Sequence, residues 1–141
     1  MKLIALMFLA LAVLTTRSMA ADKAEPAKSD SRVFELRTYY AAPGKMADLH
    51  ARFRDHTCKL LEKHGMTLIG FWVPTDAKEA EEVLIYIVAH PSEEAAKKAW
   101  DSFRQDPDWI KARDNSEKNG KLLAKPPEAK FFKPTDYSKI K

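Results

Sequence analysis

Apolar and polar residues alternate along residues 33–40, where the sequence reads Val-Phe-Glu-Leu-Arg-Thr-Tyr-Tyr. Successive side chains of a β-strand point to opposite faces, so Phe34 and Leu36 fall on one face and Glu35 and Arg37 on the other. The pattern predicts a strand. We expect the Phe34 face to meet the helices and the Glu35 face to lie on the open side of the sheet, toward any partner subunit.

A helix is predicted from about Lys45 to His64, because a Pro-Gly pair precedes this segment and Gly65 follows it as a C-terminal cap. At about 100° per residue, four apolar side chains fall within one narrow arc. They are Met46, Leu49, Phe53 and Leu60. This arc is the expected buried stripe.

Three histidines lie on the same predicted helix. His56 and His64 fall in or beside the buried stripe, His50 lies at its margin, and Cys58 points to the opposite side. Each histidine is explained by a hydrogen-bonded imidazole at the edge of the core, and His64 also by the preference for cations at a helix C-terminus. A functional role for His56 remains open beside that structural explanation.

The second half of the chain alternates in the same way between strand and helix patterns. The expected elements are strands at 66–73, 83–90 and 128–133, a helix beginning at Ser92, and a shorter helix beginning at Asp106-Pro107. The stretch 74–82 is charged and without periodicity, which predicts a hairpin loop. Gly70, beside two aromatic residues, predicts a bend or a close approach to the backbone. The run at 83–90 is almost entirely apolar, as in a strand buried on both faces.

The predicted order is β-α-β-β-α-β, with an extra helix before the last strand. This order is typical of the ferredoxin-like α+β fold, an antiparallel sheet with helices on one face. The other face of such a sheet is open, and here it is too apolar to remain in water. We therefore expect a homodimer in which two sheets pack together to form a dimeric α/β barrel.

The N-terminus carries the pattern of a signal peptide. Lys2 supplies a positive charge, the twelve residues Leu3–Leu14 are all apolar, and the small residues Ser18 and Ala20 occupy the two positions that a signal peptidase recognises. The alternative is a retained membrane anchor, but a membrane-spanning helix needs about 20 apolar residues. We predict cleavage after Ala20, a periplasmic or secreted protein, and no stable membrane span after cleavage.

Cleavage would divide the chain into a signal peptide at 1–20, a flexible leader at 21–31 and one domain at 32–138. A chain of 141 residues with 45% hydrophobic residues suits a single core. The formal net charge of +4 falls to +2 when the signal peptide is removed. That balance excludes nucleic acid as an expected partner. The single cysteine, Cys58, excludes an internal disulfide.

Searches for catalytic motifs find none. The four histidines, which include His90 on the third strand, lack the spacing of a metal site, and one cysteine cannot build a thiolate site. There is no glycine-rich phosphate loop, and no serine lies in a nucleophile elbow. Cys58 and His56 diverge by about 200° on a helix, so they cannot form a dyad. We therefore predict no metal and no cofactor, and catalytic residues are unknown.

Several short motifs resemble one protein family in both order and spacing. They are Glu35-Leu36-Arg37-Thr38-Tyr39, Pro43-Gly44-Lys45, Glu62-Lys63-His64-Gly65, Gly70-Phe71-Trp72 and Asp106-Pro107-Asp108-Trp109. Across about residues 32–138 the chain resembles the NIPSNAP domain, a member of the dimeric α/β-barrel superfamily. The resemblance implies the fold and the dimer. It carries over no catalytic residues, and other members of the superfamily include monooxygenases and haem-degrading enzymes.

Two functions remain open. The first is a non-catalytic interaction or structural homodimer. The alternative is a small-molecule binding protein, or a cofactor-independent monooxygenase-like enzyme, that takes a small hydrophobic or aromatic ligand. The candidate ligand-binding residues are Glu35, Arg37, His56, Trp72, Tyr86 and His90. An internal cavity that an acid or a histidine faces favours the alternative, and a filled core favours the first function.

Overall fold

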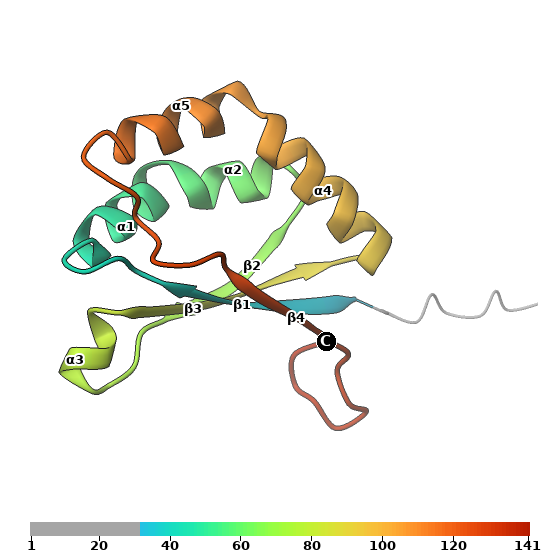
Figure 1. The fold of residues 1–141 in the computed structure, drawn as a ribbon. Helices are drawn as coiled ribbons and strands as arrows, with labels where there is room; N and C mark the ends of the chain where they lie inside the picture. Colours follow the sequence, from blue (N-terminus) through green and yellow to red (C-terminus); the bar gives the residue numbers. More distant parts are fainter. Residues whose placement is uncertain (1–31) are drawn as a thin grey trace, which may run out of the picture.

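The computed structural model describes residues 32–141, which form one four-stranded sheet with helices packed on it (Figure 1). The strands are β1 (Val33–Tyr40), β2 (Thr67–Trp72), β3 (Val83–His90) and β4 (Glu128–Phe132). The helices are α1 (Met46–Arg52), α2 (Cys58–Lys63), α3 (Ala77–Ala80), α4 (Glu93–Gln105) and α5 (Pro107–Ser116), and a π-helical turn, η1 (Phe53–Thr57), joins α1 to α2. The predicted signal peptide 1–20 and leader 21–31 lie outside the described residues.

The sheet has the strand order β2-β3-β1-β4, and every neighbouring pair is antiparallel. Helices α1, α2, α4 and α5 all lie on one face, whereas α3 and the C-terminal segment project from the other side (Figure 1). This arrangement confirms the predicted ferredoxin-like α+β fold. We call the face away from the four large helices the open face.

The predicted helix starts are confirmed by hydrogen bonds. The hydroxyl of Ser92 accepts from the backbone N–H of Ala95 at 3.1 Å at the start of α4. The carboxylate of Asp106 accepts from the backbone N–H of Asp108 at 2.8 Å, with Pro107 as the first residue of α5. In the loop 74–82, where no helix was predicted, Asp76 caps the short helix α3 in the same way.

The long helix predicted from Lys45 to His64 is interrupted by the π-helical turn η1. Four of its buried side chains, Leu49, Phe53, Thr57 and Leu61, are spaced four residues apart. A spacing of four is longer than the 3.6-residue turn of an α-helix, so a regular helix would carry this stripe away from the core. A single π turn has a wider repeat and keeps all four side chains on the sheet side.

The π turn also explains two wrong predictions. His56 lies within this turn, where the rotation per residue is not that of an α-helix, and it is exposed and does not lie beside the buried stripe. Cys58, predicted on the outer face, is half-buried and packs against the core. A prediction that assumes the same rotation of about 100° for every residue cannot reveal such a turn.

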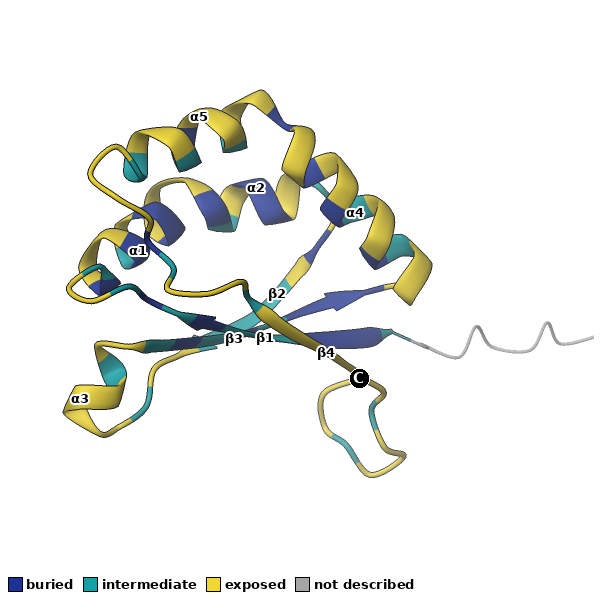
Figure 2. Ribbon diagram, viewed as in Figure 1, coloured by how far each residue is buried: buried dark blue, intermediate teal, exposed yellow. Residues whose placement is uncertain are grey.

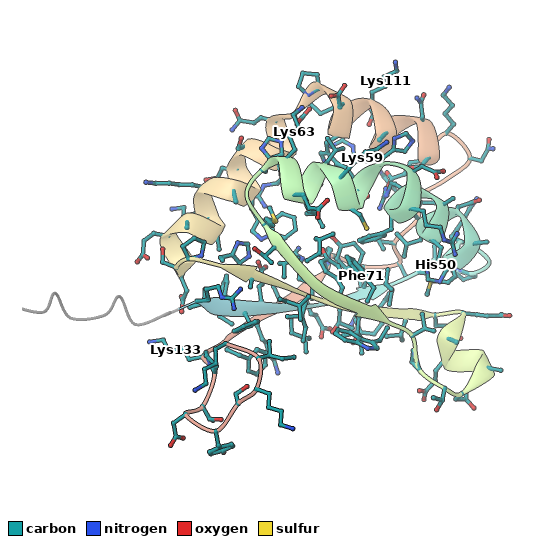
Figure 3. The ribbon with its side chains drawn as sticks, turned by 180° about the vertical axis from the view of Figure 1, so that it is seen from behind. His50, Lys59, Lys63, Phe71, Lys111 and Lys133 are labelled. Atoms are coloured by element: carbon teal, nitrogen blue, oxygen red, sulfur yellow. The ribbon has the colours of Figure 1, made fainter. Side chains whose placement is uncertain are left out.

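The space between the sheet and the helices is filled by aromatic side chains. The ring of Tyr86 is fully buried and stacks on Phe71 with a centroid distance of 5.2 Å. Phe53 from η1 meets Tyr86 edge-on at 5.3 Å, and Tyr39 does the same from β1. Figure 2 shows the buried positions along the sides of the helices that face the sheet, and Figure 3 shows Phe71 beneath the helix layer. The described core is closely packed.

The predicted faces of β1 are reversed. Glu35 and Tyr39 point to the helices, where Glu35 bonds to Trp100 of α4, whereas Phe34 and Leu36 lie on the open face. Alternation separates the two sets but does not say which set meets the helices. The decisive factor is the indole N–H of Trp100, which gives a buried carboxylate a donor on that side.

The open-face side of β3 is only partly covered in the single chain. Ile85 and Ile87 of β3 are only half-buried there, so the prediction that this strand is buried on both faces is wrong for the single chain.

On β2 the register shifts between Leu68 and Gly70. The indole of Trp72 folds back over Gly70, where a Cβ would lie 2.6 Å from two ring atoms. Both the predicted bend and the predicted close approach at Gly70 are confirmed.

Candidate functional site

Three of the six predicted ligand-binding residues meet between the sheet and α4. Glu35 accepts hydrogen bonds from Arg37 Nη1 at 2.7 Å, His90 Nε2 at 2.9 Å and Trp100 Nε1 at 2.6 Å. We call these four residues the Glu35 cluster. Trp100 was not among the predicted residues, because its 65-residue separation from Glu35 hides the contact in the sequence.

Each member of the Glu35 cluster is positioned by regular structure. Glu35 and Arg37 are two residues apart on β1 and therefore share a face. His90 is the last residue of β3, and the register of β1 and β3 brings it opposite Val33. Trp100 projects from α4 toward the sheet. Glu35 is only 2% exposed, so its carboxylate depends on these donors in place of water.

The electrostatics of the cluster favour a charged pair. Burial by itself would raise the pKa of Glu35, but hydrogen bonds from His90 and Trp100 and the charge of Arg37 outweigh it and hold the pKa below its ordinary value. The pKa of Arg37 is raised: burial opposes the cation, and the phenol groups of the core and the Glu35 carboxylate favour it. The guanidinium also lies 4.2 Å from the ring centroid of Trp100, a cation–π contact.

This geometry is better suited to stabilising the fold than to acid–base catalysis. A carboxylate that accepts three hydrogen bonds and has a lowered pKa is a weak base. Within the Glu35 cluster, two buried nitrogens have no hydrogen-bond partner, Nδ1 of His90 and Nε of Arg37. The cluster is therefore polar and tightly bonded around Glu35, with two unused nitrogens at its periphery.

The other three predicted residues do not join the cluster as a single site. Tyr86 is nearest, in the adjoining core, where its hydroxyl donates to the hydroxyl of Tyr39 at 3.1 Å. Trp72 is 50% exposed at the opposite side of the sheet. His56 lies on the outer side of the helix layer, in a hollow of about 470 Å³ between α2 and α5 that Lys59 and Lys111 also line (Figure 3). Ligand binding by the six residues stays a prediction.

The sequence analysis missed a second polar group on the helix side. His64 at the end of α2 lies 2.7 Å from Asp106 through Nε2 and 2.9 Å from Ser102 through Nδ1. Lys63 also reaches Asp106, at 2.8 Å, beside the junction of α4 and α5 (Figure 3). The sequence indicated Asp106 only as a helix cap and His64 only as a helix end, and these residues lie 42 positions apart.

Two further properties concern the described part of the chain. Within residues 32–141, no group of three or more histidine, cysteine, aspartate or glutamate side chains is placed to hold a metal ion. In the same residues, no helix has both the length and the apolar character needed to cross a membrane.

The comparison with family models matches the NIPSNAP model to residues 34–139. The chain belongs to the NIPSNAP family. This result confirms the resemblance of the short motifs. No curated protein matches the chain.

Solved structures of NIPSNAP proteins share this fold. A NIPSNAP family protein of unknown function from Agrobacterium tumefaciens is 18% identical with a TM-score of 0.67, and the match covers 80% of this chain and 96% of that one. A NIPSNAP-like domain protein from Burkholderia xenovorans is 15% identical, with a TM-score of 0.65 and coverage of 77% and 90%. A Streptomyces coelicolor monooxygenase, solved with nanaomycin D, is 14% identical, with a TM-score of 0.51 and coverage of 77% and 92%. At these identities the likeness shows the fold alone.

The Glu35 cluster predicts a large and coupled effect on stability. Glu35→Ala should lower the free energy of unfolding by about 3–5 kcal/mol, because it leaves Arg37, His90 and Trp100 without their shared acceptor. The double change to Ala at positions 35 and 37 should cost less than the sum of the two single changes. Urea unfolding followed by circular dichroism measures all three. Glu62→Ala, at an exposed position of α2, is the control and should change stability by less than about 0.5 kcal/mol. Additive effects would contradict the coupling.

The lowered carboxyl pKa values predict acid sensitivity. The pKa of Asp106 is held well below its usual range by hydrogen bonds from Lys63 and His64, and that of Glu35 is lowered as described. Such groups stabilise the fold above their unfolded pKa values of about 4, and the contribution is lost as the pH falls through the folded values. Unfolding free energy should therefore be flat from pH 7 to 5 and fall below about pH 4. Glu35→Gln should make the fall of the unfolding free energy below about pH 4 less steep. An unchanged slope would show that Glu35 does not titrate with folding.

Proposed function

We propose that this NIPSNAP protein is exported and acts as a structural or interaction homodimer whose two copies meet through the open face of the sheet. The observation that supports the proposal is the apolar character of that face. Its larger apolar side chains are Phe34, Leu36, Ile69, Trp72, Ile85, Ile87 and Phe132. Exposed apolar patches of this kind mark interaction surfaces.

The charge distribution supports a second copy as the partner. On the two central strands the open-face positions are all uncharged, while charged side chains lie on the edge strand β4, at Glu128 and Lys130. Sheet-on-sheet packing would thus bury aliphatic and aromatic groups at the centre and leave charges at the rim. Trp72 and Phe132, which are 50% and 49% exposed, would gain most from such packing. A stable interface would bury on the order of 1,600 Å² in total.

The C-terminal segment already lies on the open-face side of the sheet (Figure 1). Pro134, Ser138 and Ile140 border, together with Phe34 and Leu36, a hollow of about 300 Å³. The proposed interface therefore includes this segment as well as the strands. The hollow beside this segment would give the proposed interface a concave border.

The same hollow supports the alternative function. Its lining is mostly apolar, with Leu36, Ile69 and Ile87 at its floor, so a small hydrophobic or aromatic ligand suits it. A monooxygenase-like activity has only the shared fold as support, and a fold does not determine an activity. The aromatic rings that pack against one another between the sheet and the helices favour the interaction protein. Native mass spectrometry of protein purified from its own host distinguishes the two, because a retained small molecule would favour the binder.

The proposed dimer predicts the effect of one charge at the centre of the open face. Ile87→Asp should convert a micromolar dimer into a monomer, because two carboxylates would be buried at a two-fold interface without partners. Light scattering after size-exclusion chromatography measures the change. Ile110→Asp is the matched control, because Ile110 is an exposed isoleucine on α5 at the helix side and should leave the dimer intact. Cys58→Ser should also remain dimeric. A wild-type monomer throughout the micromolar range would refute the proposal.

The proposed export predicts a mature N-terminus at Ala21. Protein recovered from the native cell should begin there, because a signal peptidase would cleave after Ala20. Intact-mass spectrometry measures the terminus. Leu9→Arg, which breaks the apolar run, should leave unprocessed protein in the cytoplasm. Wild-type protein that retains Met1 would overturn the proposal.

A further inference from the structure

Ser102, His64 and Asp106 form a continuous hydrogen-bonded chain on the outer side of the helix layer. Ser102 comes from the last turns of α4, His64 follows the last residue of α2, and Asp106 caps α5. The Ser102 hydroxyl lies 2.9 Å from His64 Nδ1, and His64 Nε2 lies 2.7 Å from Asp106 Oδ2. A hydroxyl bonded to an imidazole that a carboxylate orients is the structural signature of an activated nucleophile.

The protonation state of this chain follows from the carboxylate. The pKa of Asp106 lies well below its usual range because Lys63 and His64 donate to it and the backbone N–H of Asp108 adds a third bond. An ionised carboxylate only accepts hydrogen bonds, so Nε2 of His64 carries a hydrogen. In the neutral imidazole Nδ1 then has a free lone pair, and the Ser102 hydroxyl donates to it. This is the tautomer that a general base for Ser102 needs.

The capping of α5 does not require this chain. The cap uses Oδ1 of Asp106, which accepts from the backbone N–H of Asp108 at 2.8 Å. The other oxygen, Oδ2, is thereby available to His64 and Lys63. Asp106 is buried, whereas Ser102 is exposed, so the buried carboxylate directs an imidazole toward a hydroxyl at the surface.

A substrate can reach the hydroxyl. Ser102 and His64 both line an open hollow of about 450 Å³ between α4 and the turn that follows α2. Lys98 lines the same hollow one helical turn before Ser102, and Ala95 and Ala99 supply an apolar wall. A positive charge in the same hollow can stabilise the negative charge that develops on a carbonyl oxygen under attack.

We propose that Ser102 is the nucleophile of an ester-hydrolysing site, with His64 as its general base and Asp106 as the positioning residue. Ser102 Oγ forms a bond to the carbonyl carbon of a small carboxylic ester while its proton passes to His64 Nδ1. The bond from the carbonyl carbon to the leaving oxygen then breaks, and His64 returns the proton to the leaving alcohol. Water repeats the sequence on the acyl-serine, which releases a carboxylic acid and restores Ser102. Lys98 stabilises the oxyanion in both steps. This site lies on the helix side and does not depend on the proposed dimer.

A fluorophosphonate probe tests the nucleophile on the full chain in its native assembly. Mass spectrometry should locate the label on Ser102, because the oriented imidazole of His64 accepts the hydroxyl proton as the serine attacks the probe. Ser102→Ala changes one exposed side chain and should abolish labelling and the hydrolysis of 4-nitrophenyl acetate. Labelling of Ser102 no faster than that of another serine such as Ser138 would overturn the proposal.

Asp106→Asn separates a catalytic arrangement from a structural one. Asparagine caps a helix as well as aspartate, so the fold should be retained. Its amide can donate to Nε2, which moves the ring hydrogen to Nδ1 and removes the base, so labelling should fall at least about 100-fold. A folded Asp106→Asn protein that labels like wild type would refute the role of the carboxylate. Lys98→Ala should slow labelling, whereas the neighbouring Lys97→Ala should not. Equal rates in these two variants would remove Lys98 from the site.

Discussion

The buried carboxylate of Glu35 is the constraint on which the arrangement of the chain depends. A charge that is removed from water needs several donors, and here they come from β1, β3 and α4 through Arg37, His90 and Trp100. These bonds fix the position of α4 over the sheet and determine which face of β1 the helices cover. Consequently Glu35 and Arg37 face the helices, and Phe34 and Leu36 are left on the open face.

Much of the fold could be predicted because local chemistry specifies it. Strands β1 and β3 have the predicted bounds, and Ser92, Asp106 and Gly65 mark helix ends through caps that short sequence patterns reveal. The orientation of β1 could not be predicted in this way. The alternating pattern does not tell which of the two faces meets the helices. The contact that decides it, the hydrogen bond from Trp100 to Glu35, joins residues far apart in the chain.

The candidate sites were predictable only where neighbours in sequence are neighbours in space. Glu35 and Arg37 share a strand face, as the alternation in the sequence indicates, and this places them close enough to pair. His56 was misplaced because it lies within a π turn that changes the rotation of the helix, and no single residue in the sequence indicates that turn. The contacts of His64 with Ser102 and Asp106 depend on how α2 packs against the junction of α4 and α5, which a search for short motifs cannot reveal.

The Glu35 cluster, the open face and the surface of α4 differ in which groups they expose and in what those groups can do. The carboxylate of the Glu35 cluster is buried and accepts three hydrogen bonds, so it serves to hold α4 to the sheet. The open face has area and apolar character but few polar groups, which suits association. Only the surface of α4 combines an accessible nucleophile, an oriented base and a neighbouring charge. Because catalysis requires reactive groups that a substrate can reach, that surface is where an activity of this NIPSNAP chain would arise, on the opposite side of the sheet from the proposed dimer interface.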